Sequence, residues 1–201
     1  MPALRPVRLR PLRDREHYTA LIAEAIPRAQ VSLWIASATV KDLQVEAPRG
    51  SRARASARYV SFLDVLEGLH ARKVELRLLY GGFLSRPFVE DLRRHRALHR
   101  GGLQIRHCPR VHLKLVVIDG ALLYLGSANL TGAGLGAKGE GRRNFELGML
   151  SDDDALLDEM QGVYETIWSG SACGGCRRRD SCPAPLDAKT GTSRGFSRRR
   201  V

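Results

Sequence analysis

The stretch VHLKLVVIDGALLYLGSAN, residues 111–129, decides the fold of this chain. It contains two apolar runs that predict strands over 112–118 and 121–126. Asp119-Gly120 separates the runs, and this pair suits the type I′ turn of a hairpin because both positions need a positive φ. We therefore expect a tight β-hairpin at the centre of the molecule.

The same stretch brings polar groups to one end of the predicted hairpin. Side chains two residues apart on a strand share a face, so His112 and Lys114 project together. Ser127 and Asn129 are again two apart and stand where the returning strand ends. This set suits a phosphate, because the ammonium supplies charge while the hydroxyl and the amide donate to non-bridging oxygens. The imidazole is then the nucleophile or the proton carrier.

Helices and strands alternate on the N-terminal side of the hairpin. Their spacing predicts helix 14–28, strand 31–36, helix 62–69, strand 74–80, helix 87–99 and strand 103–106. On the C-terminal side we expect a strand over 144–150 and a closing helix over 152–168. Alternation followed by strands in succession favours an α/β fold built in layers.

Composition divides the chain into three parts. Residues 1–15 are predicted to be an irregular basic lead-in, 16–169 the folded domain, and 170–201 a tail rich in cysteine and arginine. An arginine-rich loop is expected over about 39–57, and it is either a phosphate-seeking element or a solvated insertion. Its arginines and the one just after it are Arg49, Arg52, Arg54 and Arg58.

The charge of the chain is strongly positive. Among 201 residues, 33 Lys and Arg against 21 acidic residues give a formal net charge of +12. Such a surface attracts nucleic acid, or in the same way an anionic membrane, unless it is only a solvated basic surface. No apolar run approaches the roughly 20 residues that span a bilayer. The basic start also lacks the apolar stretch of a secretory signal, so we expect a cytoplasmic protein without stable membrane insertion.

The His-x-Lys-x4-Asp pattern of 112–119 and the Gly-Ser-x-Asn step of 126–129 resemble the HKD signature of the phospholipase D superfamily. The order of elements agrees over about 16–168, but the specific motifs all lie within 110–150. The resemblance implies a mixed β-sheet flanked by helices, with 16–169 as a phospholipase D-like catalytic domain. It also implies a phosphodiesterase that needs no metal or other cofactor for catalysis.

The resemblance implies catalytic roles as well. His112 would attack phosphorus and form a covalent phosphohistidine, and Lys114 would do the electrostatic work that a metal does elsewhere. Glu146 matches the family's acidic residue that orients the histidine ring. Glu140 is a competitor for that role, although its glycine-rich loop is poorly suited to holding a ring.

The other motif residues have structural alternatives. Asp119 belongs to the catalytic motif, yet Asp-Gly is a good turn by itself, and we regard this residue as more structural than chemical. Ser127 and Asn129 bind the substrate phosphate together with Lys114, or else they only cap the turn after their strand.

One motif also implies a partner. Family members that act alone carry two such motifs, because a second histidine protonates the leaving group. A single motif therefore implies a homodimer in which His112 of each copy faces the other across a two-fold axis. The leading hypothesis is a nuclease. The alternatives are a phospholipid phosphodiesterase or phosphatidyltransferase, and a non-catalytic nucleic-acid-binding subunit of a defence or repair assembly.

The cysteines form a second pattern. Cys173, Cys176 and Cys182 follow a C-x2-C-x5-C spacing, and Cys108 is the other cysteine in the chain. Their spacing resembles the cysteine triad of iron–sulfur exonucleases of the RecB-like group, in which a distant cysteine supplies the fourth ligand. The interpretations are structural Zn²⁺, an iron–sulfur cluster, or thiols without a metal.

Overall fold

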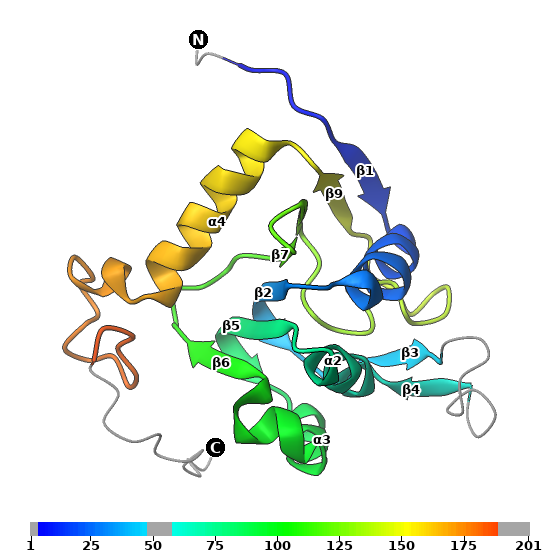
Figure 1. Cartoon of the computed structure of the whole chain (residues 1–201), viewed down its shortest axis with the longest axis horizontal. Coiled ribbons are helices and arrows are strands. Elements are labelled where there is room, and N and C mark those ends of the chain that lie inside the picture. Colours follow the sequence, from blue (N-terminus) through cyan, green and yellow to red (C-terminus); the bar gives the residue numbers. More distant parts are fainter. Residues whose placement is uncertain (1–3, 48–57, 189–201) are drawn as a thin grey trace.

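The computed structural model describes residues 4–47 and 58–188, so Arg49, Arg52 and Arg54 of the predicted loop lie outside it. Within these residues a seven-stranded sheet has the order β1-β9-β8-β7-β2-β5-β6 (Figure 1). Its strands are β1 (Arg10–Arg13), β2 (Ser32–Val40), β5 (Glu75–Leu84), β6 (Gln104–His107), β7 (Leu115–Ile118), β8 (Leu122–Gly126) and β9 (Leu147–Ser151). A separate ribbon pairs β3 (Gln44–Glu46), inside the predicted loop of about 39–57, with β4 (Tyr59–Ser61), which follows that loop.

Helices connect the strands and cover the sheet. They are η1 (His17–Ala25), η2 (Ile26–Arg28), α2 (Phe62–Ala71), α3 (Arg86–Arg94), η3 (Leu98–Gly102), α4 (Asp154–Trp168) and η4 (Ser171–Cys173). None of the helices in the described part of the chain has both the length and the apolarity that crossing a bilayer requires.

The sheet is half parallel and half antiparallel. β2, β5 and β6 run parallel, because α2 returns the chain after the ribbon and α3 with η3 returns it before β6. β7, β8, β9 and β1 pair antiparallel, and β7 joins the two halves by pairing antiparallel with β2. The predicted alternation and the predicted succession of strands correspond to these two halves.

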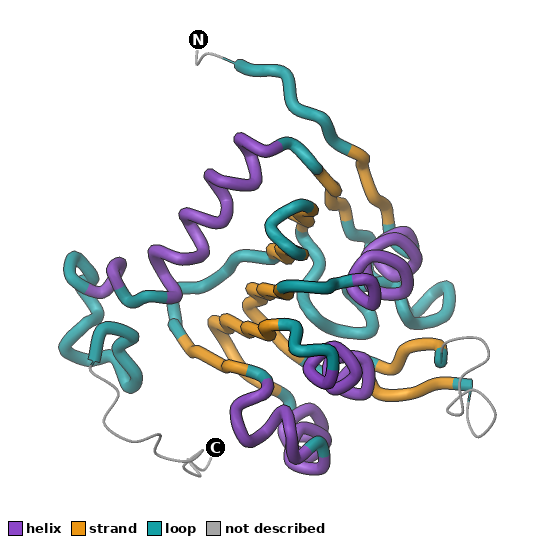
Figure 2. The backbone as a smooth tube through the Cα atoms, in the orientation of Figure 1, coloured by secondary structure: helices purple, strands orange, loops and turns teal. Residues whose placement is uncertain are grey.

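Each face of the sheet has its own apolar core. On β2, Leu33 and Ile35 belong to the core formed with η1, α2 and α3, whereas Trp34 and Ala36 pack in the core formed with α4. Figure 2 shows these helices on both sides of the strands. A strand packed on both faces explains why the sequence over 33–36 is apolar without alternation.

The predicted hairpin turn is confirmed. Asp119 and Gly120 have φ values of 56° and 63°, both in the left-handed region that a type I′ turn requires. β7 and β8 pair in the expected register, with Ile118 opposite Leu122.

The lead-in is not irregular throughout. Residues 10–13 form β1, which pairs with β9 and places Leu12 opposite Gly148. Leu12 is fully buried while its strand neighbours are exposed. One buried side chain in four residues gives no periodic pattern, so the sequence does not reveal this edge strand.

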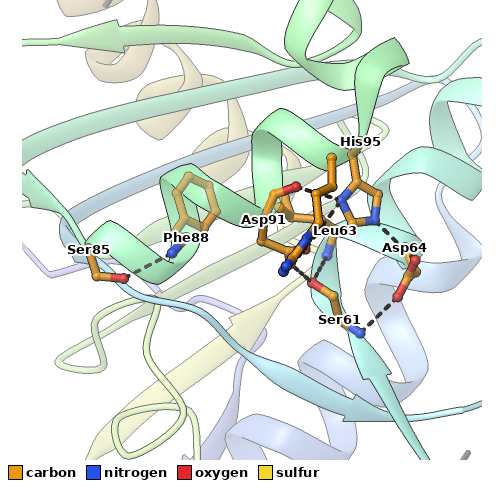
Figure 3. Close-up of polar contacts among 8 residues, drawn as sticks. Ser61, Leu63, Asp64, Ser85, Phe88, Asp91 and His95 are labelled. Atoms are coloured by element: carbon orange, nitrogen blue, oxygen red, sulfur yellow. Dashed lines mark hydrogen bonds and ion pairs between the residues drawn. The ribbon is translucent and has the colours of Figure 1, made fainter.

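The predicted helix over 87–99 is divided by a polar network (Figure 3). α3 ends at Arg94, and the next residue, His95, is buried with Nδ1 3.0 Å from the Asp91 carbonyl oxygen and Nε2 3.0 Å from Oδ1 of Asp64. Ser61 caps α2 and donates its hydroxyl proton to Asp91. Burial lowers the pKa of His95, but the bonds to Asp91 and Asp64 outweigh it and raise that pKa above its ordinary value. The network therefore ties α3 to the start of α2.

Candidate active site

The candidate site lies at the edge of the sheet where several strands begin or end. β7 begins at Leu115 and the neighbouring β8 ends at Gly126, so the residues outside these ends meet. Backbone bonds continue past the strands, since Gly126 N donates to Lys114 O at 3.1 Å. Ser127 N likewise donates to Leu147 O at 2.9 Å. The parallel strands β2 and β5 end at the same edge, which is where α/β sheets commonly bind ligands.

His112 and Lys114 lie together, although the strand predicted over 112–118 begins later, at Leu115. Nζ of Lys114 lies 3.0 Å from Nδ1 and 3.2 Å from Nε2 of the His112 ring, and it donates to the His112 carbonyl oxygen at 2.8 Å. The His112 ring is exposed. An ammonium can only donate, so the ring nitrogen that accepts from it carries a lone pair and no proton. That lone pair can act as a nucleophile once the ammonium turns to the phosphate.

Lys114 is half-buried beside the ring. Burial lowers the pKa of its ammonium, and the Glu146 carboxylate opposes part of that effect. A poorly hydrated cation acts on a phosphate more strongly than a fully solvated one. Lys114 is therefore placed to stabilise negative charge beside His112.

Ser127 and Glu146 form a hydrogen-bonded pair next to this lysine. The Ser127 hydroxyl donates to Oε2 of Glu146 and accepts from Leu147 N at 3.1 Å. Nδ2 of Asn144 donates to Oε1 of Glu146 at 3.1 Å. The carboxylate is thus held at both oxygens, which fixes it near the Lys114 ammonium.

The predicted contact between Glu146 and His112 is absent. Within residues 4–47 and 58–188, no hydrogen bond joins the two side chains, because the ring contacts Lys114 and the carboxylate contacts Ser127 and Asn144. Glu140, the competitor for this role, is exposed in the glycine-rich segment.

Asn129 lies in the segment after β8 and contacts the end of β2. Its Oδ1 accepts from Thr39 N at 3.1 Å and from the Ser37 hydroxyl at 3.4 Å. The Ser37 oxygen in turn accepts from Leu130 N at 2.9 Å. These bonds fix the orientation of the amide, so its NH₂ group is the end that can donate to a ligand.

Three supporting residues were not predicted from the sequence. Asp14 accepts from Glu146 N with Oδ1 at 3.1 Å and donates its own N–H to Glu146 O at 3.1 Å. The buried rings of His17 and Tyr124 meet edge to face, with centroids 5.7 Å apart. A Cβ at Gly126 would lie 2.4 Å from the Tyr124 hydroxyl. Gly126, the glycine of the Gly-Ser-x-Asn step, leaves room for the Tyr124 side chain, and it was the one feature of the sequence that pointed to this tyrosine.

Asp119 is not part of this site. It lies at the other end of β7, where Oδ1 accepts from Val31 N at 2.7 Å and from Ser32 N at 2.9 Å. Both of its carboxylate oxygens also accept from Gln30 N. These contacts correct the assignment of Asp119 as catalytic, because they give it the structural role that the Asp-Gly turn indicated.

The cysteines surround a different cavity. Cys108, Cys173, Cys176 and Cys182 all line it, near the end of α4, and all four are free thiols. Among the residues that the structure describes, no three side chains of the metal-ligating types are grouped so as to hold an ion.

The sequence matches the model of the family described as "Cardiolipin synthase, PLD-like domain" over residues 22–168, most of the chain. This chain belongs to the phospholipase D superfamily. The match includes the predicted motif region, and it confirms the superfamily that the motifs indicated. Among curated proteins, no sequence matches this phospholipase D superfamily member.

Solved structures share its fold. The crystal structure of a phospholipase D family member, Nuc from Salmonella typhimurium, is 17% identical with a TM-score of 0.53, over 82% of this chain and 95% of that one. NucT from Helicobacter pylori is 14% identical with a TM-score of 0.52, over 79% and 95%. Phosphatidylserine synthase from Haemophilus influenzae Rd KW20 is 14% identical with a TM-score of 0.52, over 77% and 35%. These likenesses confirm the predicted α/β fold with a mixed sheet flanked by helices.

Proposed function

We propose that this chain is a phosphodiesterase that cleaves nucleic acid through a covalent phosphohistidine on His112. The observation that carries the proposal is the contact between the exposed His112 ring and the Lys114 ammonium. Asn129 stands at the same sheet edge with an NH₂ group that can donate to a phosphate oxygen, and Ser127 can do so once its hydroxyl turns away from Glu146. These contacts support the assignment of His112 as nucleophile, Lys114 as cation, and Ser127 and Asn129 as hydrogen-bond donors to the phosphate.

The chemistry follows from these groups. A ring nitrogen of His112 attacks phosphorus, so that a P–N bond forms while the bond from phosphorus to the leaving oxygen breaks. A general acid protonates that oxygen. Water then attacks the phosphohistidine, which restores the ring and releases the second product. Throughout, Lys114 offsets charge on the non-bridging oxygens, work that metal ions do in many phosphoryl-transfer sites.

Glu146 would orient His112 during this reaction. The Lys114 ammonium contacts both the His112 ring and the His112 carbonyl oxygen. The same ammonium must turn toward the incoming phosphate. The ring then needs another partner, and the Glu146 carboxylate is close enough to act on the Lys114 pKa. A carboxylate on the second ring nitrogen would fix the tautomer and stabilise the imidazolium.

Nucleic acid is the favoured substrate because of charge. A net charge of +12 gives sequence-independent attraction to a phosphodiester backbone, and every linkage in that backbone is a chemical target for the site. An exposed nucleophile also suits a polymer, which cannot enter an enclosed pocket.

We further propose that the active form is a homodimer. Phe145, Leu147 and Met149 alternate along β9 and the residue pair before it, and their exposed fractions are 98%, 67% and 36%. This apolar stripe flanks Glu146, and large exposed apolar surfaces mark interaction sites. A second copy covering the stripe would bring its own His112 to the site as the general acid.

The test is cleavage of single- and double-stranded DNA and RNA in excess chelator. Wild type should cut at least one of them, His112→Ala should lose the activity, and His99→Ala, which removes another exposed histidine on η3, should keep it. A phosphoryl adduct on the denatured wild type, missing from His112→Ala, would support the covalent step.

Two other results would favour a function other than nucleic-acid cleavage. The family description names a cardiolipin synthase, so release of headgroups from vesicles of anionic phospholipid, without nucleic-acid cleavage, would favour a lipid phosphodiesterase or phosphatidyltransferase. Salt-sensitive binding without turnover, unchanged in His112→Ala, would favour a binding subunit of a defence or repair assembly.

A further inference from the structure

The four cysteines face one cavity of about 370 Å³ although they come from distant parts of the sequence. Cys108 follows β6, while Cys173, Cys176 and Cys182 follow α4. All four are half-buried free thiols. Chance placement of four thiols around one hollow is improbable in a chain whose only cysteines, by sequence, are these four.

The tail folds by a regular step of three residues. Cys173 N donates to Gly170 O at 2.8 Å, Cys176 N to Cys173 O at 3.1 Å, Arg179 N to Cys176 O at 2.9 Å and Cys182 N to Arg179 O at 3.2 Å. These successive turns keep the segment compact. All three cysteines of the C-x2-C-x5-C spacing line the same cavity.

The tail is anchored to the rest of the protein. Leu186 packs against the core beneath α4, and Arg179 Nε bonds Oδ2 of Asp187 at 2.8 Å. Gly170 has a φ of 89°, and a Cβ there would lie 2.5 Å from Asp187 N, so the chain passes closely over itself. The positions of the three thiols are thus set by packing.

Cys108 is held separately, on the way to the candidate active site. Its N–H donates to Tyr80 O of β5 at 3.0 Å, and its carbonyl accepts from Val111 N at 2.9 Å. This turn leads directly into His112. A ligand bound by Cys108 and by the tail would consequently fix the segment that carries the proposed nucleophile.

The walls of the cavity suit a centre with thiolate ligands. Val111, Ile167 and Leu186 line it with apolar surface, which excludes water. Arg110 and Arg178 also line the cavity. Arginines around the hollow would offset the negative charge that four thiolates bring.

We propose that Cys108, Cys173, Cys176 and Cys182 bind an iron–sulfur cluster. Four sulfurs around one zinc ion, each about 2.3 Å from it, would lie about 3.8 Å from one another. The four thiols line a hollow of about 370 Å³, which is larger than one ion fills, and four cysteine thiolates are the usual ligands of an iron–sulfur cluster. Each thiol would lose its proton to solvent and form one iron–sulfur bond.

The test is the composition of the full chain purified without oxygen. Iron and acid-labile sulfide should be present in equal amounts, together with the visible absorption of iron–sulfur centres. The Cys173→Ser/Cys176→Ser variant and Cys108→Ser should each lose bound iron by at least about tenfold. Ser181→Ala, which alters a cavity-lining residue that is not a ligand, should keep it.

Three results would overturn the proposal. They are zinc in place of iron, no iron even after reconstitution with ferrous iron and sulfide, and full iron content in Cys108→Ser. If the variants fail to fold, thiol alkylation of wild type answers the question. The four cysteines should resist alkylation when loaded and react after chelation, and equal reactivity in both states would refute a cluster. Neither measurement depends on the proposed nuclease activity.

Discussion

Replacing Gly81 with alanine tests how the backbone holds His112. Gly81 lies in β5 where the Val111 backbone crosses it, and a Cβ there would lie 1.7 Å from Val111 O and 2.7 Å from Val111 C. Contacts under 3.0 Å are not tolerated, so the two backbones must separate by about 1.3 Å. Nε2 of His107 holds the Gly81 carbonyl at 3.0 Å, which leaves the Val111 segment to move.

The expected loss follows from that displacement. A shift of about 1 Å in a catalytic group costs roughly 10²-fold in rate, or about 2.7 kcal/mol of transition-state stabilisation. The backbone clash should also reduce the free energy of unfolding by about 1–3 kcal/mol. We therefore expect Gly81→Ala to fold at moderate temperature and to lose most of its kcat.

The assay is hydrolysis of bis(p-nitrophenyl) phosphate, followed alongside thermal unfolding. Gly68→Ala is the matched control, because Gly68 lies in α2 and a Cβ added there would have nothing within 4 Å, so this variant should keep its kcat. If Gly81→Ala is folded and its kcat matches wild type, the Val111 backbone does not position His112.

Three further predictions follow from contacts described above. Asp119→Asn weakens the hydrogen bonds to Gln30, Val31 and Ser32, so it should lower the free energy of unfolding, measured in denaturant melts, by about 1–2 kcal/mol. Rate assays should show an unchanged kcat, and a large fall in kcat would restore a catalytic role for Asp119. His95→Gln should destabilise the protein mostly at acidic pH. The folded pKa of His95 is raised, so its stabilisation is complete below the unfolded pKa and disappears as pH rises through the folded value; a stability difference that is the same at all pH values would contradict this. Lys114→Met should reduce kcat by about 10²–10³-fold. Because burial lowers the pKa of Lys114, the wild-type activity should fall at a lower pH than an ordinary lysine would give, and Lys114→Arg should move that fall upward; an unmoved pH profile would exclude Lys114 as its origin.

The sequence predicts the hairpin and the meeting of His112 with Lys114 because both depend on neighbours in the chain. A two-residue turn fixes the register of its strands, and a separation of two residues keeps side chains together even where the strand has not yet begun. Local chemistry of this kind can be read without knowledge of the tertiary structure.

The support around Glu146 could not be predicted in the same way. Asp14 precedes it by 132 residues, and their two hydrogen bonds, one through the Asp14 side chain and one between backbones, exist only because β1 pairs with β9. The network of His95 is similar, since its partner Asp64 lies on another helix. Such contacts depend on how elements pack, and no short-range pattern records them.

β7 sets the distance between Lys114 and Asp119. Lys114 lies beside His112 at one end of this strand and Asp119 clamps the backbone at the other, with four buried residues between them. At about 3.4 Å per residue, the two ends lie roughly 17 Å apart along the strand. One residue more or fewer would turn the lysine to the opposite face and pull the clamp out of reach. The four residues between Lys114 and Asp119 therefore fix how far the candidate site lies from the turn that anchors β7.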